Sequence, residues 1–180
     1  ARAESTRFRR KVALGIAFAD PDVASVGARL DQLDPQAIVI GSAAGDSNGR
    51  ARILGGEESL LRLYADARDG RLLGAAMVAA GGEHRAHLLA WAIQRGETAQ
   101  GLLQLPFYHP VVEEMLQTAL KEIARAADAL RLLAEQAQKR VYLPGEQVVR
   151  EGDPGEELFV IVEGEADVVI KAGDQITPVA

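Results

Sequence analysis

The sequence contains no cysteine. That absence excludes a disulfide scaffold, a thiol nucleophile and thiolate metal sites, and it is typical of a cytoplasmic protein. No apolar run approaches the roughly 18 residues that a membrane-spanning helix needs, so we expect no membrane partner. Positive charge is also scarce: the net charge is −6, which makes a nucleic-acid backbone an unfavourable partner.

The composition is otherwise that of an ordinary globular protein. Hydrophobic residues make up 48% and charged residues 26% of the 180-residue chain, which is long enough for one domain or two small ones. A basic cluster near the start has no apolar segment beside it, so residues 1–11 are interpreted as a lead-in or linker rather than a targeting signal. The cluster consists of Arg7, Arg9, Arg10 and Lys11.

Both ends of the chain have the features of a fragment. Ala1 stands first in place of Met. Residues 176–180 resemble the beginning of a strand with no closing element. We therefore expect this chain to be a piece of a larger protein.

The first pattern along the chain is that of strands. Residues 12–19 form an apolar run that stops at Asp20-Pro21, which predicts a buried strand. Residues 36–40 predict a second short strand. Between them, the leucines in residues 30–33 suggest a single helical turn.

A glycine-rich stretch and a turn signal follow. Residues 41–56 predict a loop that is broken by an edge segment at 50–54. Two apolar runs, at 60–65 and 72–79, then flank Asp69-Gly70. This arrangement predicts a hairpin, because glycine tolerates the positive φ of a primed turn.

Helical periodicity dominates the next part of the chain. Residues 83–94 predict a helix that ends before a glycine, and Thr98 can cap a short helix over residues 99–105. An amphipathic helix is expected from Val111, and a second helix or a continuation of the first covers roughly residues 127–139. The predicted fold class is α+β, a mainly antiparallel sheet with helices packed on one side.

The sequence pattern changes from helical to strand-like at Arg140. Residues 158–162 and 166–170 are β-branched runs that we expect to form a hairpin with a tight turn at 163–165. A partial all-β roll is therefore predicted at the C-terminus. The expected division of the chain is 1–11 for the lead-in, 12–125 for the α+β domain, 126–139 for a connecting helix and 140–180 for the β-roll.

The candidate for chemistry is His109, which precedes a predicted helix start, with Glu114 about one turn into that helix. A carboxylate that orients an imidazole is the arrangement used in general acid/base catalysis, because it fixes the tautomer and stabilises the imidazolium. The alternative is a loop histidine beside a carboxylate that favours the positive end of the helix dipole. By spacing alone, this alternative is the stronger interpretation.

The surrounding sequence favours a catalytic role. Residues 17–27 read Ala-Phe-Ala-Asp-Pro-Asp-Val-Ala-Ser-Val-Gly and resemble the opening of the dimerisation domain of pyridine nucleotide-disulfide oxidoreductases, in particular the dihydrolipoamide dehydrogenase-like members. Similar parts follow in the same order: an arginine-bearing loop at 49–52, a strand at 61–66, a turn into 71–75, a helix start at Gly82-Glu83 and the His-Pro segment. The resemblance covers about residues 12–125.

This resemblance implies a homodimer in which His109 and Glu114 act in the partner subunit's active site. There the histidine would exchange protons with redox-active thiols beside a flavin, and the glutamate would orient its ring. The His109-Pro110 bond is expected to be cis. The sequence departs from the family's commonest His-Pro-Thr-x-Ser-Glu by having Val111 and Glu113 for the Thr and Ser, which leaves the disulfide substrate open.

The cofactors implied by the resemblance are FAD and NAD(P), bound by upstream domains of the full-length protein. Neither Gly55-Gly56 nor Gly81-Gly82 forms a G-x-G-x-x-G fingerprint. No cofactor-binding or metal-binding residue is therefore expected in this chain. We expect the chain alone neither to bind flavin nor to turn over substrate.

The C-terminal part carries a second resemblance. Residues 142–155 and 158–164 resemble the first strands of a cyclic nucleotide-binding domain, with glycines at the tight turns. The phosphate-binding cassette of that family comes later in its sequence, so no residue here is assigned to cAMP or cGMP. A different small β-barrel or a cupin-like roll is the alternative.

Three weaker signals have simple explanations. His84 and His87 have a spacing that permits metal binding, but an exposed helix face is favoured because no third ligand is apparent. Trp91 is interpreted as a core residue or a dimer contact. The charged residues 121–139 are interpreted as a solvated face or connector.

Two functional hypotheses follow from the sequence. The first is a dimerisation domain that supplies an acid/base pair to a reductase and is fused to a segment responsive to a cyclic nucleotide or a partner protein. The second is a non-catalytic homodimeric regulatory module that uses the same fold as a dimerisation platform.

Overall fold

The computed structural model describes residues 10–150, 152, 159–172 and 175–178. The chain forms two compact units, Ala1–Ala137 and Gln138–Ala180. Most of the predicted lead-in at residues 1–11 lies outside the described residues. Within the described ranges, no helix combines the length and the apolar character needed to cross a membrane.

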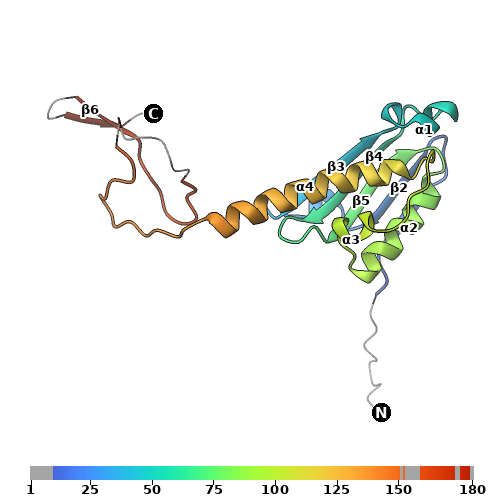
Figure 1. The fold of residues 1–180 in the computed structure, drawn as a ribbon, viewed down its shortest axis with the longest axis horizontal. Coiled ribbons are helices and arrows are strands. Elements are labelled where there is room, and N and C mark those ends of the chain that lie inside the picture. The colour runs from blue at the N-terminus through green and yellow to red at the C-terminus, as the bar shows by residue number, and fades with distance from the viewer. Residues whose placement is uncertain (1–9, 151, 153–158, 173–174, 179–180) are drawn as a thin grey trace, which may run out of the picture. The chain divides into compact units, whose positions relative to one another are not determined.

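The first unit is built on an open five-stranded sheet (Figure 1). Its strands lie in the order β1-β2-β5-β4-β3, and every neighbouring pair is antiparallel. This arrangement confirms the predicted α+β class with a mainly antiparallel sheet. The strands are β1 (Leu14–Ala17), β2 (Asp22–Gly27), β3 (Ile38–Ala44), β4 (Leu60–Asp66) and β5 (Leu72–Ala79).

One face of the sheet carries the core. Leu61 and Leu63 of β4 pair in register with Met77 and Ala75 of β5, and all four are buried. The helices that cover this face are α2 (Gly82–Arg95), α3 (Ala99–Leu103) and α4 (Glu114–Gln136), as Figure 1 shows. On the opposite face several apolar side chains are partly exposed: Val23, Ile40, Leu60 and Val78.

Local capping determines where the helices begin and end. The α3 helix begins after Thr98, whose Oγ1 accepts a hydrogen bond of 3.0 Å from the Gly101 N–H, as predicted. The α2 helix ends at Gly96, which adopts a left-handed φ of 74°. The predicted helical turn at residues 30–33 is a short 3₁₀ helix, η1 (Leu30–Gln32). The long α4 helix is continuous, so the sequence beyond residue 127 continues it and does not start a second helix.

The edge segment expected at residues 50–54 is wrong, because this stretch is the short helix α1 (Gly49–Ile53). The Asn48 Oδ1 accepts a hydrogen bond of 2.8 Å from the Ala51 N–H and so caps the helix. The predicted loop also starts too early, since β3 continues through Gly41 to Ala44.

The strand at residues 12–19 is present in part, but it is not buried. β1 is an edge strand that pairs only with β2, so most of its side chains face solvent. Ile16 is the residue of β1 that packs against the core. A run of apolar residues cannot by itself distinguish a central strand from an edge strand.

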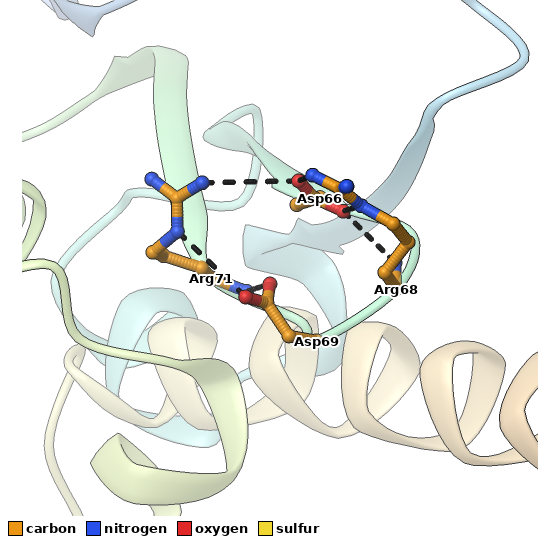
Figure 2. A network of polar contacts seen from close by, with 4 residues as sticks. All are labelled: Asp66, Arg68, Asp69 and Arg71. Atoms are coloured by element: carbon orange, nitrogen blue, oxygen red, sulfur yellow. Dashed lines mark hydrogen bonds and ion pairs between the residues drawn. The ribbon is translucent and has the colours of Figure 1, made fainter.

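The predicted β4–β5 hairpin is confirmed, but its loop is longer than a two-residue primed turn. The Asp66 N–H bonds to the Arg71 carbonyl at 2.9 Å, and only Gly70 in this loop has a positive φ, of 69°. Figure 2 shows how arginines order the loop around Asp66. The Arg68 guanidinium lies 2.7 Å from the Asp66 carboxylate, and Arg71 lies 3.8 Å from it.

This loop strongly perturbs one carboxyl group. The hydrogen bonds from the Arg68 side chain and backbone, together with the charges of Arg68 and Arg71, lower the pKa of Asp66 to about 2. The pKa of Arg68 is raised by the same pair. Asp66 is therefore ionised at any physiological pH and holds the loop closed.

In the described part of the second unit, β6 (Val169–Ala172) and β7 (Gln175–Pro178) form an antiparallel hairpin. The predicted strand at 158–162 is not formed over residues 159–162, and residue 158 lies outside the described residues. The second predicted strand, at 166–170, begins only at Val169. Val160 and Val162 are exposed, and a strand without a packing surface or further strands beside it has little to stabilise it.

Candidate functional site

The candidate site lies in the connector between α3 and α4. His109 lies within this connector, and the His109-Pro110 peptide bond is cis, as the resemblance implied. Glu114 is the first residue of α4. The His109 side chain is 80% exposed and that of Glu114 27% exposed, so the pair lies at the surface with its carboxylate partly sheltered.

The two predicted site residues are in direct contact. The His109 Nδ1 lies 2.9 Å from the Glu114 Oε1. The second carboxylate oxygen, Oε2, accepts a hydrogen bond of 3.1 Å from the Val111 N–H. Both oxygens of Glu114 are therefore engaged within its own loop, where the N-terminal end of α4 also favours a negative charge.

These contacts determine the protonation of the pair. The hydrogen bond from His109, followed by that from the Val111 backbone, lowers the pKa of Glu114. An ionised carboxylate can only accept, so the His109 Nδ1 must carry a hydrogen. The neutral ring then has its free lone pair on Nε2, and the side chain as a whole is 80% exposed. Such a nitrogen can accept a proton from a group outside this chain.

A residue that the sequence interpretation missed also contacts this loop. The Asn48 Nδ2 donates a hydrogen bond of 3.1 Å to the Val111 carbonyl. Asn48 is only 7% exposed and lies between α1 and the preceding 3₁₀ helix η2 (Gly45–Ser47). An asparagine followed by a helix could have identified it as a cap, but nothing in the local sequence connects position 48 with position 111.

A buried charged cluster lies at the start of α2. Arg85 is 2% exposed, and its Nη2 donates a hydrogen bond of 2.6 Å to the Ala80 carbonyl. Burial lowers the pKa of Arg85, while the charges of Glu113, Glu83 and Asp22 oppose that shift. Glu113, one of the two departures from the family motif, therefore acts on a buried cation from α2.

The N-terminus of α2 is occupied by a side chain of the sheet. Asp22 of β2 has a lowered pKa, first because of a hydrogen bond with the Glu83 side chain and then because the Glu83 and Gly82 backbone N–H groups bond to it. Its side chain is close enough to Gly82 that a Cβ there would lie 3.2 Å from the Asp22 Cβ. The Asp22 carboxyl therefore lies at the first turn of α2, where the positive end of the helix dipole favours a negative charge.

The weaker sequence candidates are placed apart from this site. His84 lies 3.4 Å from the Glu83 carboxylate, and the His87 Nδ1 lies 2.8 Å from the Glu83 carbonyl. Over the described ranges, no group of three or more His, Cys, Asp or Glu side chains is placed to hold a metal ion. Trp91 is 62% exposed and contacts the His87 ring edge-on, so it is not a core residue of this chain.

The sheet order and the helices on one face define an α+β domain with a His109–Glu114 contact at the start of α4. The family model described as the pyridine nucleotide-disulphide oxidoreductase dimerisation domain matches residues 14–120. The chain belongs to this family.

Curated relatives are similar over the same part of the chain. The dihydrolipoyl dehydrogenase of Rhizobium etli is 31% identical over 109 residues, which cover 59% of this chain and 22% of that protein. The mitochondrial dihydrolipoyl dehydrogenase 1 of Arabidopsis thaliana is 28% identical over 114 residues, covering 62% of this chain and 22% of that protein. The chain therefore spans about a fifth of the length of these relatives.

Solved structures share the fold. The HOCl-induced flavoprotein disulfide reductase RclA of Escherichia coli superimposes with a TM-score of 0.57 at 21% identity, over 67% of this chain and 28% of that one. LpdA of Mycobacterium tuberculosis superimposes with a TM-score of 0.58 at 19% identity, over 67% of this chain and 26% of that one. At such identities the likeness concerns the fold alone.

Proposed function

We propose that this chain is the C-terminal dimerisation domain of an FAD-dependent pyridine nucleotide-disulfide oxidoreductase of the dihydrolipoamide dehydrogenase-like type. It pairs with a second copy about a two-fold axis, and His109 serves as the acid/base of the partner subunit's flavin-disulfide site. The observation that carries the proposal is the contact between His109 and Glu114, which lie 2.9 Å apart while the ring stays 80% exposed.

The chemistry of the pair suits this role. Glu114 holds the proton on Nδ1, which leaves Nε2 to take a proton from a thiol and to return it. When Nε2 is protonated, the ionised carboxylate stabilises the imidazolium. The ring is largely exposed, and among the described residues its hydrogen-bond partner is Glu114, so a group that exchanges protons with Nε2 would have to come from outside this part of the chain. An acid/base group placed in this way supports a site that a second molecule completes.

Among the described residues, the glycine pair that begins α2 does not suit a phosphate group of FAD or NAD(P). A glycine-initiated helix is a common place for a phosphate group, and α2 begins at such a glycine pair. The Asp22 carboxyl, however, already lies beside Gly82, where its negative charge disfavours a phosphate. We therefore assign FAD and NAD(P) to other domains of a longer protein, and we expect the isolated chain to be inactive.

The catalytic role is tested by the His109→Gln substitution in the longer protein. Glutamine keeps a polar side chain but cannot accept and return a proton at neutral pH. Loss of a general acid/base typically reduces the rate by about 10²–10⁴-fold, so we expect disulfide turnover to fall by this order while the flavin stays bound. The matched control is His84→Gln, an exposed histidine on α2, which should leave turnover unchanged. Unchanged turnover in the His109 variant would show that the acid/base assignment is wrong.

The homodimer is tested on the 180-residue chain itself. Size-exclusion chromatography with light scattering should give twice the 19.2 kDa mass of one chain. A single monomeric peak at high concentration counts against the proposed pairing. This measurement needs no cofactor and no substrate, so it separates assembly from catalysis.

For the C-terminal part we propose a regulatory segment, the first half of a cyclic nucleotide-binding-like β-roll. In this division residues 12–125 form the dimerisation domain, 126–139 a connecting helix and 140–180 the partial roll after a lead-in at 1–11. Support comes from the sequence resemblance at residues 142–164 and from the β6–β7 hairpin. Calorimetric titration of the longer protein with cAMP and cGMP tests the idea. Absence of binding heat with both nucleotides would indicate that the segment binds a partner protein or belongs to another β-fold.

The alternative is a non-catalytic homodimeric regulatory module. The absence of cysteine from this chain means that any redox-active thiols must lie elsewhere. The sequence upstream of residue 1 distinguishes the two functions. A cysteine pair with two glycine fingerprints there supports the reductase, and a chain without them supports the module.

A further inference from the structure

We infer that Asn48 is the positioning residue of the His109–Glu114 pair, which it holds in place by fixing the Val111 carbonyl. This inference rests on the proposed function for its catalytic meaning. The geometry that carries it is confined to contacts within the described chain.

Asn48 is itself held rigidly. Its backbone N–H bonds to the Gly45 carbonyl at 3.0 Å, and its own carbonyl accepts from the Arg52 N–H at 3.1 Å. Its side-chain Oδ1 accepts from the Ala51 N–H at 2.8 Å. Because Oδ1 must face this donor, the amide orientation is fixed and Nδ2 must point the other way.

The other end of the amide holds the loop that carries the pair. The Asn48 Nδ2 donates to the Val111 carbonyl at 3.1 Å, and the Val111 N–H donates to the Glu114 Oε2 at 3.1 Å. Val111 is thus held by side chains at both its carbonyl and its N–H. A buried donor such as this one is costly to leave unpaired, so the interaction resists any rotation of Val111.

The consequence reaches His109 through Glu114. Among the described residues, Glu114 is the hydrogen-bond partner of the His109 ring, which is otherwise exposed. If Val111 rotates, Oε2 loses its donor and the carboxylate can turn, which moves Oε1 away from Nδ1. The chain of contacts therefore runs from Asn48 through Val111 and Glu114 to the imidazole.

Asn48 also caps α1, and the two roles use different atoms. Capping uses Oδ1, whereas holding Val111 uses Nδ2. Asn48→Ser keeps an oxygen that can cap the helix but has no amide donor. Asn48→Asp keeps the shape and the capping oxygen but sets an acceptor against the Val111 carbonyl. Thr98→Ala is the control, because it removes the cap of α3 and leaves residue 111 untouched.

The test is ¹⁵N NMR of the histidine rings, with ¹³C titration of the Glu114 carboxyl, in the 180-residue chain. In the native chain His109 should be mainly the Nδ1–H tautomer, and the Glu114 pKa should lie below its ordinary value. In Asn48→Ser and Asn48→Asp we expect the ratio of Nδ1–H to Nε2–H to fall about fivefold, as the loss of one typical net hydrogen bond predicts. The Glu114 pKa should rise in both variants. Because serine adds no charge, a rise in that variant cannot come from simple repulsion.

Three results would overturn the inference. One is a native tautomer ratio and a native Glu114 titration in both folded Asn48 variants, which would leave Asn48 as a helix cap alone. Another is the same loss of tautomer preference in Thr98→Ala. The third result comes from the native chain and holds even if the Asn48 variants fail to fold. Absence of Overhauser contacts between the Asn48 side-chain amide protons and the Val111 Hα would show that the proposed hydrogen bond does not form in solution.

Failure of this inference is distinguishable from failure of the proposed function. The NMR readouts require neither flavin nor turnover. In the longer protein, Asn48→Ser should lower kcat with little change in KM and should alter the pH profile of turnover. A tautomer that responds to position 48, together with turnover that ignores His109→Gln, would sink the catalytic proposal and leave the positioning role intact.

Discussion

The backbone of Gly41 in β3 lies directly against the Ala119 carbonyl of α4, so closely that a Cβ at position 41 would overlap that oxygen. The contact brings the last helix onto the sheet at the edge strand. It also explains why a strand residue is glycine, since any side chain would push α4 away. The helix that carries Glu114 can therefore pack closely on the sheet because residue 41 has no side chain.

Gly41→Ala should destabilise the first unit. Backbone overlap cannot be relieved by a side-chain rotation, so we expect the loss at the upper end of the about 1–3 kcal/mol typical of overpacking. Urea unfolding followed by circular dichroism should show a lower midpoint with an unchanged slope. Gly49→Ala is the control, because that glycine begins α1 with open space around it. Equal midpoints for the two variants would contradict the tight contact.

Asp66→Asn should lower stability in a pH-dependent way. The folded pKa of about 2 lies below the ordinary 3.8, so the carboxylate contributes stability that is complete above pH 3.8 and is lost as the pH falls through about 2. The shift corresponds to about 2 kcal/mol, and since Arg68 is 84% exposed, solvent screening reduces our expectation to about 1 kcal/mol at pH 7.

The same variant has an exposed counterpart. Asp31→Asn removes the surface pair with Arg29, in which both side chains are more than 60% exposed, and should change stability by less than about 0.5 kcal/mol. Thermal unfolding of both variants between pH 2 and pH 7 provides the comparison. A difference for Asp66→Asn that is constant across this range would show that ionisation of Asp66 does not stabilise the loop.

Arg85→Met should be strongly destabilising. Methionine replaces the aliphatic part of the side chain, but it removes the positive charge that faces Glu113, Glu83 and Asp22. It also leaves the Ala80 carbonyl without its donor. Removing one partner of a buried charge interaction typically costs about 3–5 kcal/mol, and we expect a loss of this order.

The control for this change lies on the same helix. Arg95 is 76% exposed and pairs with Glu97 at the surface, so Arg95→Met should cost less than about 0.5 kcal/mol. Chemical denaturation at pH 7 measures both variants. If Arg85→Met is as mild as Arg95→Met, the buried cluster does not depend on its cation.

Trp91 reports on association. It is the single tryptophan of the chain and is 62% exposed within it, which leaves the predicted dimer contact as the interpretation to test. Iodide should quench its fluorescence efficiently in dilute solution and less efficiently at concentrations where light scattering detects a dimer. Quenching that does not change across the monomer–dimer transition would place Trp91 outside the interface.

Local sequence patterns predicted those parts of the fold that depend on local chemistry. Gly96 ends α2 and Thr98 caps α3 as expected, because each acts on its own helix. The His109–Glu114 contact was also accessible, since five residues that span a helix start bring the two side chains together. The family resemblance then gave the order of the parts along the chain, but not the order of the strands in the sheet.

The remaining features depend on contacts between distant segments. Asn48 and Val111 are 63 positions apart, and the Asp22 side chain lies beside Gly82, which begins a helix about sixty residues later. Glycine is typical of loops, but Gly41 lies in β3, where the close approach of α4 leaves no room for a side chain. In the second unit the predicted hairpin at 158–170 was wrong, and β6 and β7 pair further along the chain. Strand pairing depends on which partner is available, and propensity alone does not encode that.

The two oxygens of Glu114 have different partners, one on the ring and one on the backbone. The Nδ1 of the imidazole is thereby held by a hydrogen bond, and Nε2 can gain or lose a proton. A proton can arrive at or leave Nε2 without either bond of the carboxylate being broken. The loop therefore needs little rearrangement when the ring gains or loses a proton. The free-energy cost of ordering the carboxylate and the ring arises during folding and not at each proton transfer.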